Sequence, residues 1–198
     1  MTELFTSRKE IVLASGSPRR RAYFTELGLL FRVVAADIEE RRGADETAEE
    51  YVRRLAREKA AAVAEHWCRS WIVAADTVVC LDGRVLEKPA DPAEAVEMLL
   101  QLSGRQHDVH TAVCLLNRDE GVEELLLVTT RVQFWEVPRE TVERYVATGE
   151  PMDKAGSYGI QGVGAFLVRD ICGSYSNVVG LPLCELVEML MRYELIGN

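Results

Sequence analysis

The stretch IVLASGSPRRR, residues 11–21, runs from a predicted strand into a predicted helix, and this junction is the strongest indication of the fold class. Residues 11–14 form a short apolar run, which predicts a buried strand. Small hydroxyl residues and three arginines follow, and residues 22–28 then predict a helix. Small residues at such a junction let backbone N–H groups approach an anion, and the helix N-terminus adds a favourable partial charge. The stretch therefore predicts an α/β fold with an anion-binding loop.

Length and composition fit one α/β domain over residues 1–198, with 48% hydrophobic and 28% charged residues. The formal net charge is −9, from 23 Lys and Arg against 32 Asp and Glu. A nucleic-acid-binding surface shows a basic stripe, so we expect no nucleic-acid partner. An arginine cluster in so acidic a chain is better explained by a polyphosphate ligand.

Nothing in the sequence predicts a membrane segment. No apolar run approaches the roughly 20 residues that span a bilayer, and residues 1–10 are polar, without the apolar segment of a secretory signal. We therefore expect no membrane partner and a cytoplasmic location.

Cysteine and histidine spacing gives no metal or disulfide pattern. The five cysteines are widely spaced without a Cys-x-x-Cys pair, which favours buried, reduced thiols. His66, His107 and His110 are expected to be structural or surface residues. Of the three, His107 is the one most suited to lining a cleft.

The remaining elements follow from periodicity and capping signals. Asp82-Gly83 predicts the turn of a hairpin, and Thr47 and Asp91 predict helix N-caps. Strands are expected over residues 31–35, 71–80, 84–86, 109–116, 123–135 and 166–171, and helices over 47–64, 92–102, 138–147 and 183–195. Residues 148–164 are expected to form a glycine-rich loop.

Asp76 is the carboxylate that an ordinary core does not explain. It follows the apolar run 72–75, and Asp76-Thr77 is expected to interrupt that strand. A carboxylate there must be paired, bound to metal or placed at a strand end facing a cleft. We therefore favour a functional role for Asp76.

Three other polar segments have a structural reading beside the functional one. Glu39 and Glu40 fit the start of a solvated charged run, and Lys88 fits an ordinary surface lysine. Residues 19–21 fit the exposed first turn of a helix, but cations are unfavourable at that end, which favours an anionic ligand. Lys88 reaches the end of the sheet that holds Asp76 only if the hairpin register allows it.

Taken together, these residues suit hydrolysis of a nucleotide polyphosphate. Carboxylates suit a hard divalent cation, and basic groups suit phosphate. Asp76 could activate a water near the cation while Arg20 and Lys88 stabilise charge on the phosphoryl and leaving groups. The Gly-x-x-x-x-Gly-Lys-Ser/Thr loop of common NTPases is missing, which argues against a motor-type ATPase or GTPase.

In its motifs the chain resembles the Maf family of nucleoside triphosphate pyrophosphatases over almost its whole length. The matching segments, in the family's order, are LASGSPRR (13–20), ADTVV (75–79), EKP (87–89), LSG (102–104), DKAGSYGIQG (153–162), GSY (173–175) and NVVGLPL (177–183). The resemblance implies an inosine-triphosphatase-like mixed sheet with flanking helices and a cleft between two lobes. It also implies a homodimer that hydrolyses a nucleoside triphosphate to the monophosphate and pyrophosphate with Mg²⁺ or Mn²⁺.

The same resemblance assigns roles to individual residues. Asp76 matches the proposed proton acceptor, and Arg20, Glu40 and Lys88 match other residues associated with activity. Glu40 and Asp76 are the candidate metal ligands, and the division of the base and metal-ligand roles between them stays open. The residues matched to substrate binding are Ser15, Ser17, Arg19, Lys59, Thr77 and Gln161.

Arg19, Thr77 and Gln161 match the branch of the family that acts on dTTP and UTP. The Gln161 amide can accept from uracil N3–H and donate to O4, but a rotated amide also serves cytosine, so Arg19 would have to fix the choice. A broader house-cleaning activity on modified pyrimidine nucleotides stays open. So does a nucleotide-binding regulator of cell division with little turnover.

Overall fold

The computed structural model describes residues 4–197, which divide into two compact units. Unit 1 comprises residues 4–76, 111–127 and 180–197, and unit 2 comprises residues 77–110 and 128–179. The expected mixed α/β class is confirmed. The single domain over 1–198 and the cleft between two lobes stay predictions.

The main sheet is mixed, with the strand order β3-β2-β4-β6-β7-β8 and with β5 paired to β4. β2 is parallel to β3 and β4, whereas β5 is antiparallel to β4 and β8 to β7. The strands are β2 (Ile11–Leu13), β3 (Phe31–Val33), β4 (Trp71–Leu81), β5 (Arg84–Leu86), β6 (Gln106–Asn117), β7 (Val122–Phe134) and β8 (Val168–Cys172). β4, β6 and β7 each contribute residues to both units.

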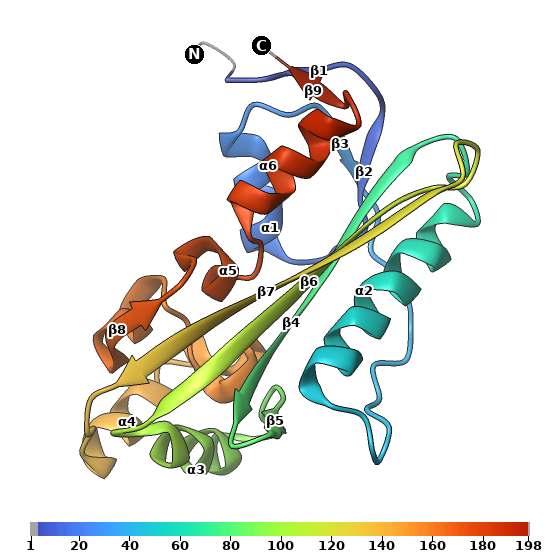
Figure 1. Ribbon diagram of the computed structural model, residues 1–198. Coiled ribbons are helices and arrows are strands. Elements are labelled where there is room, and N and C mark those ends of the chain that lie inside the picture. The colour runs from blue at the N-terminus through green and yellow to red at the C-terminus, as the bar shows by residue number, and fades with distance from the viewer. Residues whose placement is uncertain (1–3, 198) are drawn as a thin grey trace. The chain divides into compact units, whose positions relative to one another are not determined.

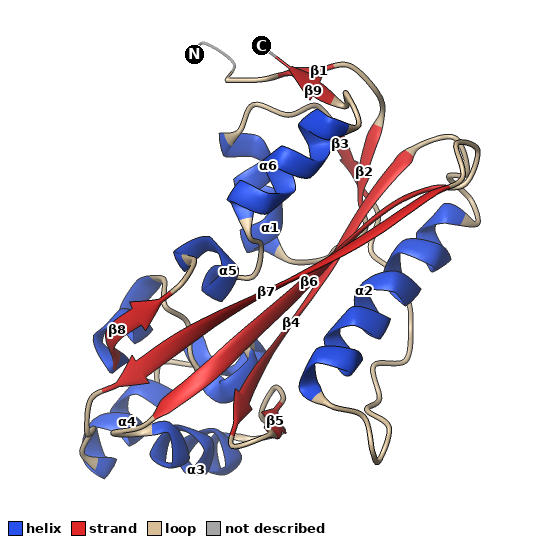
Figure 2. Cartoon of the chain, viewed as in Figure 1, coloured by secondary structure: helices blue, strands red, loops and turns tan. Residues whose placement is uncertain are grey.

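In unit 1, helices cover both faces of the sheet. α1 (Pro18–Glu26) and α6 (Leu183–Arg192) lie on one face and α2 (Ala48–Ala64) on the other (Figures 1 and 2). α2 begins with the expected capping box, in which the Thr47 and Glu50 side chains each bind the other's backbone N–H. β1 (Thr6–Ser7) and β9 (Ile196–Gly197) pair as a separate two-stranded sheet.

In unit 2, the core forms between its part of the sheet and two helices, α3 (Pro92–Leu102) and α4 (Arg139–Val146). Asp91 caps α3 as expected, since its side chain accepts from the Glu94 backbone N–H. The shorter elements are α5 (Tyr175–Val179) and the 3₁₀ turns η1 (Glu150–Asp153), η2 (Ala155–Ser157) and η3 (Gly162–Leu167).

Several expected boundaries were wrong. α1 begins at Pro18 and not at residue 22, which confirms the alternative reading of residues 19–21 as the first turn of a helix. β4 continues through Asp76-Thr77 without interruption. Residues 148–164 are not one open loop, because η1, η2 and the start of η3 lie within it. β1, α5 and β9 were not expected, because elements this short show no periodic pattern of apolar residues.

The expected burial of all five cysteines was wrong, and so was the placement of His107 at a cleft, whereas the structural role expected for His107 is confirmed. Cys80 and Cys114 are buried as expected, but Cys68, Cys172 and Cys184 are exposed. His107 is a core residue, 3% exposed and packed edge-to-face against Phe134 and Tyr158. Burial lowers the pKa of His107 to about 4, so this imidazole is neutral at physiological pH.

Among the described residues, no helix is both long and apolar enough to cross a bilayer.

Candidate functional site

Lys59 joins two carboxylates from different segments of unit 1. Its Nζ lies 2.5 Å from Asp76 Oδ1 and 2.8 Å from Glu40 Oε1. Lys59 comes from α2, Asp76 from β4, and Glu40 from the connection between β3 and α2. The structure therefore brings together three of the residues that the resemblance selected.

The position of Lys59 explains why it is buried. It lies on the face of α2 that packs against the sheet, among the buried residues Val52, Leu55, Ala56, Ala60 and Val63. A buried ammonium is unfavourable unless it is paired, and both carboxylates meet that need. A lysine within the apolar stripe of a helix was the sequence signal that could have found Lys59 without any family comparison.

Asp76 is a buried carboxylate, 7% exposed, in the middle of an apolar strand. Burial raises the pKa of Asp76, although the charges of Lys59 and Arg20 and the hydrogen bond from Lys59 oppose the rise. Glu40 raises it further by repulsion. A carboxylate whose pKa lies above the usual range is suited to accept a proton near neutral pH.

Residues 15–20 form a turn that presents the N-terminus of α1. Ser15 Oγ accepts from the Ser17 backbone N–H at 3.2 Å, and Ser17 Oγ caps the helix by accepting from the Arg20 backbone N–H at 3.4 Å. Pro18 occupies the first turn, where its missing N–H costs no helical hydrogen bond. The expected strand-to-helix junction is therefore present.

The Arg20 side chain ties this turn to two other segments of unit 1. Its Nη1 donates to the Ala75 carbonyl oxygen and its Nε to the Gly180 carbonyl oxygen, each at 2.7 Å. Nη1 also lies 3.4 Å from Ser15 Oγ. Burial lowers the pKa of Arg20, whereas the charges of Asp76 and Glu40 raise it.

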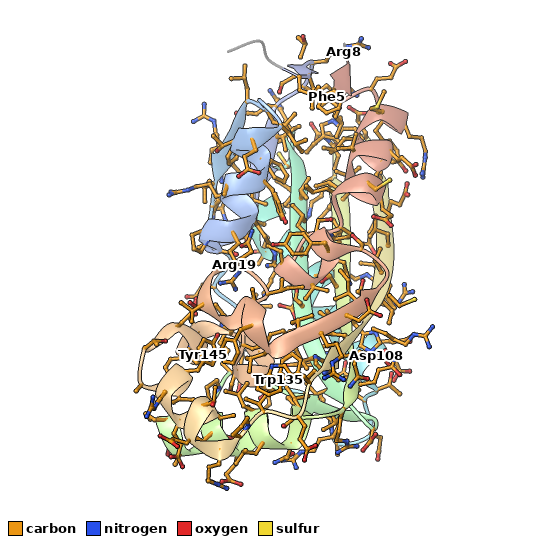
Figure 3. All side chains as sticks on the ribbon, turned by 90° about the vertical axis from the view of Figure 1, so that its left-hand side faces the viewer. Phe5, Arg8, Arg19, Asp108, Trp135 and Tyr145 are labelled. Atoms are coloured by element: carbon orange, nitrogen blue, oxygen red, sulfur yellow. The ribbon has the colours of Figure 1, made fainter. Side chains whose placement is uncertain are left out.

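These contacts explain how arginines are tolerated at a helix N-terminus. The Arg20 guanidinium turns away from the helix dipole to two backbone carbonyl groups, next to the charges of Asp76 and Glu40. Arg19 lies at the same end of α1 and is half-buried (Figure 3), whereas Arg21 is exposed. Of the three arginines, Arg20 is thus the one whose side chain lies next to the carboxylates of Asp76 and Glu40, and Arg19 is its neighbour on α1.

The other expected residues, Thr77, Lys88 and Gln161, belong to unit 2. Lys88 and Gln161 are exposed, and Thr77 is half-buried. Successive residues of a strand point to opposite faces, so Thr77 and Asp76 do not share a face of β4. In the β4–β5 ladder Val79 pairs with Leu86, and two further steps of this register would set Lys88 opposite Thr77.

A divalent cation would find two carboxylates in this cluster. Within the part of the chain that the structure describes, no three His, Cys, Asp or Glu side chains gather as a ready metal site. Asp76 and Glu40 already converge on one cation, the Lys59 ammonium. Such a donor pair fits Mg²⁺, which binds one or two carboxylates and completes its shell with water and substrate phosphate.

The fold and this cluster define the class of protein. It is a mixed α/β protein in which the buried Asp76 and the exposed Glu40 share the Lys59 ammonium, close to the N-terminus of α1. A family model described as Maf-like protein matches residues 10–193. The chain belongs to the Maf family.

Relatives align over nearly the full chain. A protein of Desulfotalea psychrophila is 50% identical over 98% of this chain and 100% of its own length. One of Nitratidesulfovibrio vulgaris is 51% identical (95% and 90%), and one of Myxococcus xanthus is 53% identical (92% and 91%). Each of the three is named dTTP/UTP pyrophosphatase.

Among solved structures, the Ham1 protein of Staphylococcus aureus matches with a TM-score of 0.49 and 18% identity, over 81% of this chain and 80% of that one. A likeness of this size says nothing about the activity of this chain.

Proposed function

We propose that this protein is a nucleoside triphosphate pyrophosphatase that hydrolyses dTTP and UTP to the monophosphate and pyrophosphate. The observation that carries the proposal is the Lys59 ammonium joining Asp76 to Glu40, with Arg20 beside them. The names of relatives about 50% identical to this chain support the same reaction and the same substrates.

Asp76 is the proton acceptor in this proposal. Water must lose a proton as it attacks the α-phosphorus, and a carboxylate with a raised pKa accepts that proton more readily than an ordinary aspartate. Lys59 fixes the Asp76 carboxylate through the 2.5 Å contact at Oδ1. In this proposal Oδ1 of Asp76 is held by Lys59, and Oδ2 would meet the cation and the attacking water.

The proposed cofactor is Mg²⁺ or Mn²⁺, held by Asp76 and Glu40. When bound, the cation would neutralise charge on the phosphate oxygens and lower the pKa of its water. Both carboxylates must be ionised to hold it, and the positive charges of Lys59 and Arg20 favour the ionised form of Asp76.

The triphosphate is proposed to be bound by the turn at the start of α1. Ser15 and Ser17 offer hydroxyl groups, and the first N–H groups of α1 have no partner within the helix. Arg20 and Lys88 supply positive charge for the phosphoryl group and the leaving pyrophosphate. Arg20 already donates to two carbonyl groups, so its contribution would be chiefly the nearby charge.

For base recognition, we propose Gln161, Arg19 and Thr77. A Gln161 amide matches uracil and thymine when its oxygen accepts from N3–H and its nitrogen donates to O4. A guanidinium only donates, so Arg19 would favour the O4 carbonyl over the amino group of cytosine. We also propose a homodimer, which sedimentation of the purified protein tests.

Product analysis tests the reaction. The purified protein is incubated with Mg²⁺ or Mn²⁺ and with each common NTP and dNTP, and the products are identified. UMP or dTMP formed together with pyrophosphate is the expected result. Orthophosphate with a nucleoside diphosphate would overturn the reaction. Tight binding without turnover would favour the nucleotide-binding regulator.

A further inference from the structure

The Gln161 side chain stands at the N-cap position of η3 without capping it. Ser, Thr, Asp or Asn at such a position accepts a hydrogen bond from the second or third N–H of the helix. The Gln161 side chain makes no such bond, and Gln161 is exposed. The first N–H groups of η3 must therefore be satisfied by another group.

Glu150 supplies the acceptor. Its Oε2 accepts from the Val163 backbone N–H at 3.0 Å, and its Oε1 accepts from the Gly164 backbone N–H at 2.9 Å. Burial acts to raise the pKa of Glu150, but the hydrogen bonds from Gly164, Val163 and Tyr145 outweigh it and hold the pKa below the usual value. Glu150 is therefore an ionised carboxylate that caps η3 from another segment.

Tyr145 of α4, labelled in Figure 3, extends this arrangement to the residues that precede Gln161. Its hydroxyl donates to Glu150 Oε1 at 2.9 Å and accepts from the Gly159 backbone N–H at 3.4 Å. Tyr145 is buried in the core of unit 2. The chain is thus held two residues before Gln161, and again two and three residues after it.

The glycines of this segment allow so close an approach. A Cβ at Gly164 would collide with the Tyr145 hydroxyl and the Gly159 carbonyl oxygen. Gly162 has φ +75°, and a Cβ there would lie 3.0 Å from Glu150 Oε2. The backbone on either side of Gln161 therefore contacts the Glu150 carboxylate and the Tyr145 hydroxyl directly.

We propose that Glu150 and Tyr145 are positioning residues that set the nucleotide base preference through Gln161. Glu150 takes over the capping of η3, which leaves the Gln161 amide available to a base edge, and Tyr145 fixes the Glu150 carboxylate. This inference rests on the proposed function, in which Gln161 reads the uracil or thymine edge. Neither Glu150 nor Tyr145 touches the nucleotide.

The test compares kcat/KM for UTP with kcat/KM for CTP. Glu150→Gln keeps the size of the side chain but sets an NH₂ group against one of the backbone N–H donors. We expect it to lower the UTP to CTP ratio about tenfold, the range expected for one directional hydrogen bond. Tyr145→Phe removes only the hydroxyl and is expected to lower the ratio by a smaller factor of about three.

Two further variants separate positioning from a general loss of stability. Glu140→Gln on α4 removes a carboxylate that pairs with Arg144 at 2.6 Å on the exposed surface, and it should leave the ratio unchanged. In a Gln161→Ala background, Glu150→Gln should have no further effect on the ratio, because its action passes through Gln161. An equal additional loss in that background would show that Glu150 acts without Gln161.

The ratio of UTP to CTP affinities is measured by calorimetry without divalent cation. It separates failure of the positioning role from failure of the proposed pyrophosphatase function. The positioning role alone is overturned if the wild-type protein hydrolyses UTP and both variants, Glu150→Gln and Tyr145→Phe, keep the wild-type UTP to CTP ratios of kcat/KM and of affinity. A wild-type protein without turnover would overturn the proposed function. A fall of the affinity ratio in Glu150→Gln would then still support the positioning role.

Discussion

The polar cluster of unit 1 and that of unit 2 use carboxylates in opposite ways. In unit 1, Asp76 is buried in an apolar strand and faces an ammonium group, and its pKa is raised. In unit 2, Glu150 is half-buried and faces two backbone N–H groups and a hydroxyl, and its pKa is lowered. The same functional group thus has a raised pKa in one place, which suits the proton transfer proposed above, and a lowered pKa in the other, where it holds a loop.

The difference lies in whether hydrogen bonds compensate for burial. Burial disfavours a charged carboxylate, and hydrogen bonds to the charged form oppose that effect. Glu150 receives three such bonds and stays ionised. Asp76 accepts from Lys59, whose ammonium is shared with Glu40. We therefore infer a catalytic role for Asp76 and a structural role for Glu150. Three variants test this division, and a fourth tests a carboxylate paired near the surface.

The largest effect is expected for Asp76→Asn. The amide cannot accept the proton of the attacking water, so turnover of UTP should fall about 10³-fold, within the range for general base catalysis. Nucleotide affinity should change far less. Steady-state kinetics and calorimetry measure both quantities, with Asp119→Asn, an exposed carboxylate of the same unit, as the control. Near wild-type turnover in Asp76→Asn would remove this residue from the base role.

Lys59→Met should change both stability and pH dependence. The loss of the ammonium leaves buried Asp76 unpaired and should lower the free energy of unfolding by roughly 3 kcal/mol. Lys59 lowers the pKa of Asp76, so its removal raises that pKa further. Asp76 must be ionised to accept a proton, so the acid limb of the pH–rate profile should move to higher pH. Lys59→Arg keeps the positive charge, so the acid limb of its pH–rate profile should stay nearer to that of the wild type. An unchanged acid limb in Lys59→Met would contradict the link between the Lys59 charge and the pKa of Asp76.

Gly164→Ala should affect base preference without affecting the general base. Its Cβ would collide with the Tyr145 hydroxyl and the Gly159 carbonyl oxygen, so the free energy of unfolding should fall by about 2 kcal/mol. The ratio of kcat/KM for UTP to kcat/KM for CTP should also fall, while the acid limb of the pH–rate profile stays at the wild-type pH. Gly43→Ala, where a Cβ makes only ordinary contacts, is the matched control. A shifted limb in Gly164→Ala would break the division between the clusters.

The smallest effect is expected for Glu46→Gln, at a charge pair near the surface. Both Glu46 oxygens accept from Arg54, at 2.7 and 2.8 Å, and these hydrogen bonds lower the pKa of Glu46 to about 2. With solvent screening, the pair should contribute roughly 1 kcal/mol to the free energy of unfolding. A lowered pKa stabilises the folded state above the unfolded value of 4.5, and this contribution is lost as the pH falls towards 2. Thermal unfolding should therefore separate the two proteins at pH 7 but not near pH 2; equal stability at pH 7 would show that the pair contributes nothing.

Local signals predicted much of the fold. Thr47 with Glu50 and Asp91 with Glu94 marked the starts of α2 and α3, because a capping side chain needs only its neighbours. The β4–β5 hairpin followed from Asp82-Gly83 in the same way. The start of α1 was placed too late, because three cations at a helix N-terminus contradict the local rule. The contacts of Arg20 with the Ala75 and Gly180 carbonyl oxygens, which resolve that contradiction, come from distant parts of the chain.

The class of fold, the family motifs and the choice of Asp76 as a candidate all came from the sequence alone, since a carboxylate in an apolar strand stands out from its neighbours. Only the tertiary structure decided which groups meet. It placed Lys59 between Asp76 and Glu40, and it placed Glu150 against the backbone N–H groups that follow Gln161. Charge pairing and remote capping act over a few ångströms in space, between residues that the sequence separates by 13 to 19 positions.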